Sequence, residues 1–141
     1  MTTQAPTLHA VDHVQLPIAV GGSATARYFY ATLLGLKEID TPALAEPGTL
    51  HFSVGWQRLD LREGAYSGVA PQAHLALRVG DLGLLIERLR YASHRVDTQQ
   101  LAQGRAYVDD PFGNRLELLD ARRHGAPEEA PRHVRDLHFS V

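Results

Sequence analysis

The chain has 141 residues, enough for one domain with a substantial core but not for two independent large domains. A hydrophobic content of 44%, a charged content of 21% and a net charge of −2 favour a small-molecule partner over nucleic acid or an anionic membrane. Because there is no cysteine, disulfides and thiolate ligands are excluded, and any metal site must use histidine, carboxylate or water.

Two further absences bear on location. No apolar run approaches the ~18 residues of a membrane span, and the first residues, Met1-Thr2-Thr3-Gln4, do not form a basic-then-apolar signal peptide. We therefore expect a cytoplasmic protein with no membrane partner.

The first half of the chain predicts one strand, one helix and three short strands. Alternating residues predict the strand over Leu8 to Val20, and Ser23 is expected to N-cap a helix that ends near Leu34, before Gly35. The three short strands are predicted over Lys37 to Asp40, Thr49 to Val54 and Gln57 to Arg62, with a turn at Gly55-Trp56.

The second half repeats this order after a Gly/Pro-containing linker. A strand is predicted over Ala73 to Val79, and Asp81 is expected to N-cap a helix that ends near Ser93. Three strands follow, near Arg95 to Thr98, Arg105 to Asp109 and Arg115 to Leu119.

The two halves also share residues. Arg58-Leu59-Asp60-Leu61 matches Arg115-Leu116-Glu117-Leu118, so each half begins with a strand that bears a histidine, His13 or His74, and ends with a strand that bears an acid. Two half-length repeats must share a core. We therefore predict an α+β fold of two βαβββ modules.

The predicted module boundaries are residues 8–63 and 71–121, followed by a C-terminal tail over 122–141. The tail ends in Leu137 to Val141, which repeats Leu50 to Val54 letter for letter, and we interpret it as a possible added edge strand.

A turn precedes the acid of the second half. Asp110-Pro111-Phe112-Gly113-Asn114 has the residues of a reversal, because proline pre-sets φ and Gly-Asn tolerates positive φ. In the strand that follows, alternation points Leu116 and Leu118 one way and Glu117 the other. The carboxylate of Glu117 is thus expected on a rigid element, facing away from the leucine layer.

Together with the first-helix ending Phe29-Tyr30-Ala31-Thr32-Leu33-Leu34-Gly35-Leu36, this turn and the βαβββ repeat resemble the vicinal oxygen chelate superfamily, over about residues 8 to 120. That superfamily includes glyoxalase I, extradiol dioxygenases and bleomycin-resistance proteins. The resemblance implies an open cup of mixed β-sheet with flanking helices, a homodimer, and one divalent metal ion on the floor of the cup.

The resemblance also implies a ligand set. His13, His74 and Glu117 match the positions of family ligands and suffice for a two-histidine, one-carboxylate site with open positions. Asp60 falls where the glyoxalase type has a fourth ligand, and its alternative role is an ion pair with Arg58 or Arg62. The metal could be Zn, Ni, Mn, Co or Fe. His51 is interpreted as a strand-surface or rim residue.

Four other side chains could line the cup and bind substrate: Arg105, Tyr107, Arg58 and Trp56. The planar guanidinium of an arginine would suit a substrate with a carboxylate, phosphate or phenolate group. The alternative is that each arginine lies at a solvated strand edge and does not bind substrate.

The leading functional hypothesis is a metal-dependent, glyoxalase-like enzyme of the lyase or isomerase type. It would act on a small molecule with vicinal oxygens through a metal-stabilised enolate, with Glu117 and Asp60 as catalytic carboxylates. The alternatives are an extradiol-type dioxygenase that uses Fe(II) and a metal-free, bleomycin-resistance-like protein that binds an antibiotic.

Overall fold

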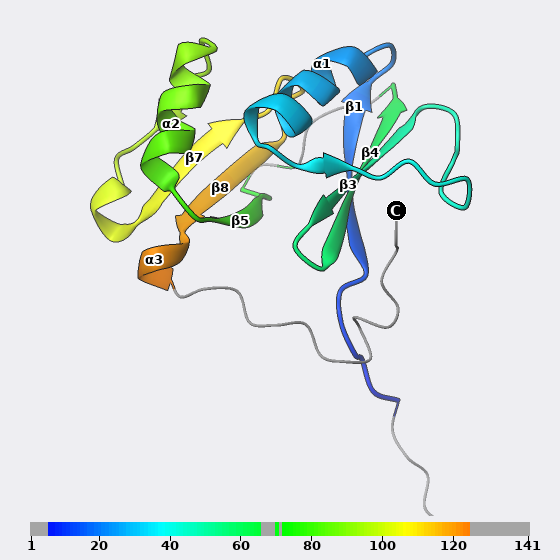
Figure 1. The fold of residues 1–141 in the computed structure, drawn as a ribbon, viewed down its shortest axis with the longest axis horizontal. Helices are drawn as coiled ribbons and strands as arrows, with labels where there is room; N and C mark the ends of the chain where they lie inside the picture. The colour runs from blue at the N-terminus through cyan, green and yellow to red at the C-terminus, as the bar shows by residue number, and fades with distance from the viewer. Residues whose placement is uncertain (1–5, 66–69, 71, 125–141) are drawn as a thin grey trace, which may run out of the picture.

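The structure is a computed structural model that describes residues 6–65, 70 and 72–124, and it contains two βαβββ modules (Figure 1). The elements of the first module are β1 (His13–Ala19), α1 (Ser23–Arg27), the π-helix η1 (Tyr28–Leu33), β2 (Lys37–Glu38), β3 (Thr49–Val54) and β4 (Gln57–Gly64). Those of the second are β5 (Leu75–Val79), α2 (Leu82–Tyr91), β6 (Val96–Asp97), the 3₁₀ helix η2 (Leu101–Gln103), β7 (Arg105–Asp109) and β8 (Arg115–Asp120). A short helix, α3 (Ala121–His124), follows β8.

Each module forms its own four-stranded mixed sheet. The strand order is β1-β4-β3-β2 in one sheet and β5-β8-β7-β6 in the other. The first strand of each module pairs in parallel with the last, and the last pairs antiparallel with the strand before it. This arrangement places the histidine-bearing start of each module beside its acid-bearing end, and it confirms the predicted α+β fold of two modules.

The elements occur where the sequence predicts them, with several shorter than expected. Asp81 N-caps α2 as predicted, because its Oδ1 accepts a hydrogen bond from the backbone N–H of Leu84 at 3.1 Å. Ser23 does not cap α1: Gly22 is the N-cap, and the Ser23 hydroxyl instead donates to Oε2 of Glu63. The predicted first strand begins at His13 rather than Leu8, because only residues from His13 onward pair with β4.

One hydrophobic core serves both modules. The first helix, which consists of α1 and η1, buries its apolar side chains in this core, and so does α2. Side chains from the strands, including β1, β3, β4, β7 and β8, also contribute to the core. The two helices also contact each other, since Arg88 of α2 donates to the backbone oxygen of Leu33 at 3.4 Å. In the described residues no helix is long and apolar enough to span a membrane. The possible strand over Leu137 to Val141 lies outside the described residues.

A buried polar network joins the second module to the first. The Asp110 carboxylate, 4% exposed, accepts hydrogen bonds from the backbone N–H groups of Phe112 and Asn114, both at 2.8 Å. It also accepts from the Tyr30 hydroxyl at 2.6 Å and from Nδ2 of Asn114 at 2.8 Å. Nδ2 of Asn114 donates in addition to the backbone oxygen of Pro17 at 2.9 Å. The network therefore ties the predicted turn to β1 and to the first helix.

Burial raises the pKa of Tyr30 far above its ordinary value, and the nearby negative charge of Asp110 raises it further. Tyr30 is fully buried, so its hydroxyl depends on Asp110 as acceptor. The neutral phenol is therefore the form that this network requires.

Gly22 lies against the same turn, and we expect Gly22→Ala to destabilise the protein. A Cβ atom at this position would lie 2.6 Å from Cε1 of Phe112 and 2.9 Å from the backbone oxygen of Ala19. Because overpacking of this kind costs about 1–3 kcal/mol, the urea midpoint should fall accordingly. Gly80→Ala is the matched control, since a Cβ there meets nothing within 4 Å. Equal midpoints for the two variants would contradict the expected clash.

Candidate functional site

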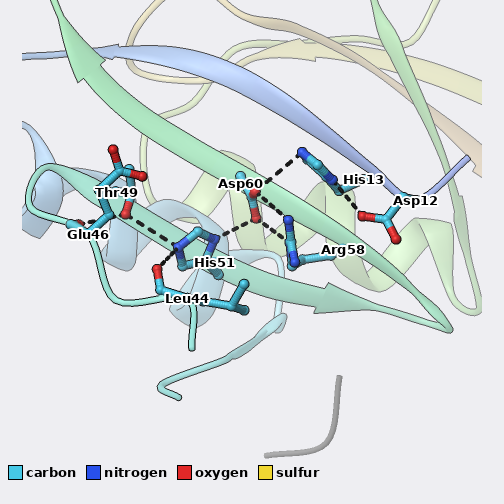
Figure 2. Close-up of polar contacts among 8 residues, drawn as sticks. All are labelled: Asp12, His13, Leu44, Glu46, Thr49, His51, Arg58 and Asp60. Atoms are coloured by element: carbon cyan, nitrogen blue, oxygen red, sulfur yellow. Dashed lines mark hydrogen bonds and ion pairs between the residues drawn. The ribbon is translucent and has the colours of Figure 1, made fainter. Parts of the chain in front are cut away.

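The acid of the first module, Asp60, is held by an arginine and a histidine (Figure 2). Asp60 is 4% exposed and lies on β4. Arg58 donates to it in a fork, from Nε to Oδ1 at 2.8 Å and from Nη2 to Oδ2 at 3.0 Å. Nδ1 of His51, on the neighbouring strand β3, lies 2.7 Å from Oδ1. Of the two roles considered for Asp60, the ion pair with Arg58 is therefore formed.

His13, at the start of β1, also lies near Asp60 (Figure 2). Its Nε2 is 3.8 Å from Oδ2 of Asp60, and its Nδ1 is 2.7 Å from Oδ2 of Asp12. A carboxylate only accepts hydrogen bonds, so the Nδ1 atom of a neutral His13 carries the hydrogen. The lone pair of Nε2 then faces Asp60.

The second module repeats the arrangement around Glu117. Glu117 is 7% exposed, and its Oε1 accepts from the Tyr107 hydroxyl at 2.9 Å, with Nη1 of Arg105 at 3.4 Å. Nε2 of His74 is 3.3 Å from the other oxygen, Oε2. Nδ1 of His74 is 3.1 Å from the backbone oxygen of Gln72, a pure acceptor, and a neutral His74 with its hydrogen on Nδ1 presents the lone pair of Nε2 to the Glu117 carboxylate.

The two arrangements are equivalent through the repeat. His51 is the cross-strand partner of Asp60, and Tyr107 is the cross-strand partner of Glu117. In each module, one carboxylate oxygen contacts a side chain on the neighbouring strand and an arginine, and the other oxygen faces Nε2 of a histidine; in the first module Arg58 also donates to that second oxygen. We call each histidine and acid, His13 with Asp60 and His74 with Glu117, a half-site.

The structure forms each half-site but does not bring the two together. Across residues 6–65, 70 and 72–124, no three histidine, aspartate or glutamate side chains form a group that could hold a metal ion. The four predicted ligands therefore occur as two pairs, one in each sheet.

The predicted substrate-binding residues lie in different settings. Arg58 donates from Nε and Nη2 to Asp60, and Tyr107 donates from its hydroxyl to Glu117. Arg105 makes one long contact to Glu117, and its Nε is buried without a hydrogen-bond partner among the described residues. Trp56 is half-buried in the turn between β3 and β4. Arg105 therefore has the most donor capacity left for a ligand.

His51 is the site residue that the sequence interpretation missed. Besides its contact with Asp60, its Nε2 lies 3.0 Å from the backbone oxygen of Leu44 and 3.3 Å from the Thr49 hydroxyl. The signal was present in the two-residue turn at Gly55-Trp56. Such a turn fixes the hairpin register, and counting back from it places His51 opposite Asp60.

The fold of two βαβββ modules is that of a known protein superfamily. The family model described as the Glyoxalase/Bleomycin resistance protein/Dioxygenase superfamily matches residues 10–118. The chain belongs to this superfamily. No curated protein matches the chain.

Solved structures agree with this assignment. A glyoxalase family protein from Bacillus anthracis is 30% identical, with a TM-score of 0.70, over 83% of this chain and 98% of that one. The fosfomycin resistance protein FosX from Mesorhizobium loti is 12% identical, with a TM-score of 0.65, over 80% of this chain and 92% of that one. FosX from Listeria monocytogenes, complexed with Mn(II) and sulfate, is 17% identical, with a TM-score of 0.65, over 83% of this chain and 96% of that one. The two FosX structures share the fold.

Proposed function

We propose that this protein is a metal-dependent, glyoxalase-like enzyme of the lyase or isomerase type that acts on a small molecule with vicinal oxygens. One observation carries the proposal. In both half-sites the Nδ1 atom of the histidine faces an outer acceptor, and Nε2 faces a carboxylate oxygen. A divalent ion would bind between Nε2 and the carboxylate oxygen in place of a proton, and metal-binding histidines usually donate their other N–H in this way.

The residues present suit a divalent ion. Imidazole nitrogen and carboxylate oxygen are ligands that Zn, Ni, Mn, Co and Fe accept. His13, His74 and Glu117 would hold the ion. Asp60 would stay outside or bind weakly, because Arg58 and His51 already donate to its oxygens.

The two half-sites would meet in a homodimer. Because they lie in separate sheets of one chain, a complete ligand set needs the first module of one copy and the second module of another. The strands β1 and β5, beside the two histidines, each pair with only one neighbour among the described residues, so each has an edge that a partner could approach.

The chain's own residues would divide the chemistry among them. When bound, the divalent ion would polarise two adjacent substrate oxygens and stabilise the negative charge of an enolate. Glu117 would detach from the ion, take the proton next to the carbonyl on Oε2, the oxygen that Tyr107 and Arg105 leave open, and give this proton back to the enolate. Arg105, with its spare donors, would orient an anionic group of the substrate, and Arg58 and Trp56 would line the other side.

A metal-free binding protein is the second candidate, because the part of one chain that the structure describes gathers no three ligands. Such a protein would bind its ligand equally well in EDTA, whereas the proposed enzyme would not. Thermal stabilisation by catechol, glyoxal hemithioacetal or bleomycin, measured with and without EDTA, distinguishes the two.

Metal analysis tests the proposed enzyme directly. After incubation with Mn(II) or Ni(II) and gel filtration, we expect close to one divalent ion per chain. His13→Ala and His74→Ala should each lose most of the bound metal, because each removes a ligand, while the exposed His9 should be replaceable without effect. A wild-type protein without bound metal after this treatment would contradict the proposal.

A further inference from the structure

We infer that Tyr107 is a positioning residue for metal binding: its hydroxyl fixes Glu117 so that Oε2 is presented together with Nε2 of His74. This inference rests on the proposed metal site. It assigns Tyr107 a role toward the ligands of the ion, in place of the substrate contact that the sequence suggested.

The contacts of Tyr107 reach both candidate ligands of its module. Its hydroxyl donates to Oε1 of Glu117 at 2.9 Å, the shortest contact that Glu117 makes among those described. Its ring centroid lies 6.2 Å from that of His74, with the planes at 80°, an edge-to-face arrangement. Tyr107 is therefore placed to fix the carboxylate and the imidazole relative to each other.

The Tyr107 ring is itself held in place. It lies directly opposite Glu117 on the paired strands β7 and β8, and the guanidinium carbon of Arg115 stacks 4.6 Å from its centroid. A tyrosine held by strand register and by a cation on its face loses little further freedom when it donates its hydrogen bond. It is therefore a rigid support for Glu117.

Arg105 cannot replace this support. Its contact to Oε1 is 3.4 Å, longer than a good N–H···O hydrogen bond. Without the Tyr107 hydroxyl, the nearly buried carboxylate would turn toward the arginine, the nearest remaining donor. That movement would take Oε2 away from His74 and would oppose metal binding.

The test compares Mn(II) binding by wild-type protein, Tyr107→Phe and Tyr91→Phe, with free Mn(II) measured by EPR. We expect Tyr107→Phe to raise the dissociation constant about 10- to 100-fold, as loss of a hydrogen bond to a metal ligand usually does. Tyr91→Phe is the matched control, because Tyr91 is 95% exposed and should bind Mn(II) like the wild type.

A second measurement separates positioning from folding. The metal-free Tyr107→Phe protein should keep the wild-type melting temperature within a few degrees, because the variant removes only one hydroxyl from a half-buried side chain. Wild-type Mn(II) affinity in Tyr107→Phe, or a loss of affinity that is matched by a large fall in metal-free stability, would overturn the inference. Absence of Mn(II) binding by the wild type would instead overturn the proposed function, and the inference with it.

Discussion

Asp110→Ala is expected to lower the free energy of unfolding by about 3–5 kcal/mol, the usual result of removing one partner from a buried charged network. The carboxylate accepts four hydrogen bonds, from Tyr30, from two backbone N–H groups and from Asn114. Alanine would leave all four donors without their acceptor, and the Tyr30 hydroxyl is fully buried. Urea denaturation at neutral pH measures the change.

The neighbouring residue provides the control. Asp109 has a 61% exposed side chain and a long 3.7 Å contact to Arg115, so Asp109→Ala should change stability by less than about 0.5 kcal/mol. If the free energy of unfolding of Asp110→Ala lies within about 1 kcal/mol of the wild-type value, the network does not join the modules as described.

The network also explains why the turn matters to the site. It ties the turn that begins β8, the strand of Glu117, to the backbone of β1, the strand of His13. A loosened connection would therefore change the relative placement of the two half-sites. For this reason we expect Asp110→Ala to impair metal binding as well as stability.

Local sequence signals were enough to predict the strands and the helices, and the repeat showed that each half begins with a histidine and ends with an acid. Alternation identified which side of β8 carries Glu117, and the repeat placed each histidine beside its acid. The hairpin turn at Gly55-Trp56 also contained the register that brings His51 to Asp60. These features depend on neighbours in the chain or on a repeat that can be read in the letters.

Contacts between the modules could not be predicted in this way. Tyr30 and Asp110 are 80 positions apart, and Pro17 and Asn114 are 97 apart, so no periodicity connects them. The first strand ends up shorter than its alternation suggests because only His13 onward finds a pairing partner. Likewise, the pattern assigned His13 and His74 to different modules but could not indicate that the two histidines of one chain would fail to meet.

The second large effect concerns the site shared between two copies. We expect His13→Ala homodimers and His74→Ala homodimers to bind no metal tightly, because every site in them lacks a histidine. A heterodimer of the two variants should recover binding. In the heterodimer, one site combines the altered first module of the His13→Ala chain with the altered second module of the His74→Ala chain. The other site combines the two unaltered modules and so keeps both histidines.

The measurement is the metal content of this heterodimer, purified through two different affinity tags. The shared-site account predicts one tightly bound Mn(II) per heterodimer, half the wild-type content, with none in either parent homodimer. A heterodimer as empty as its parents, alongside a wild type that binds metal, would show that each chain builds its site alone and would contradict the account.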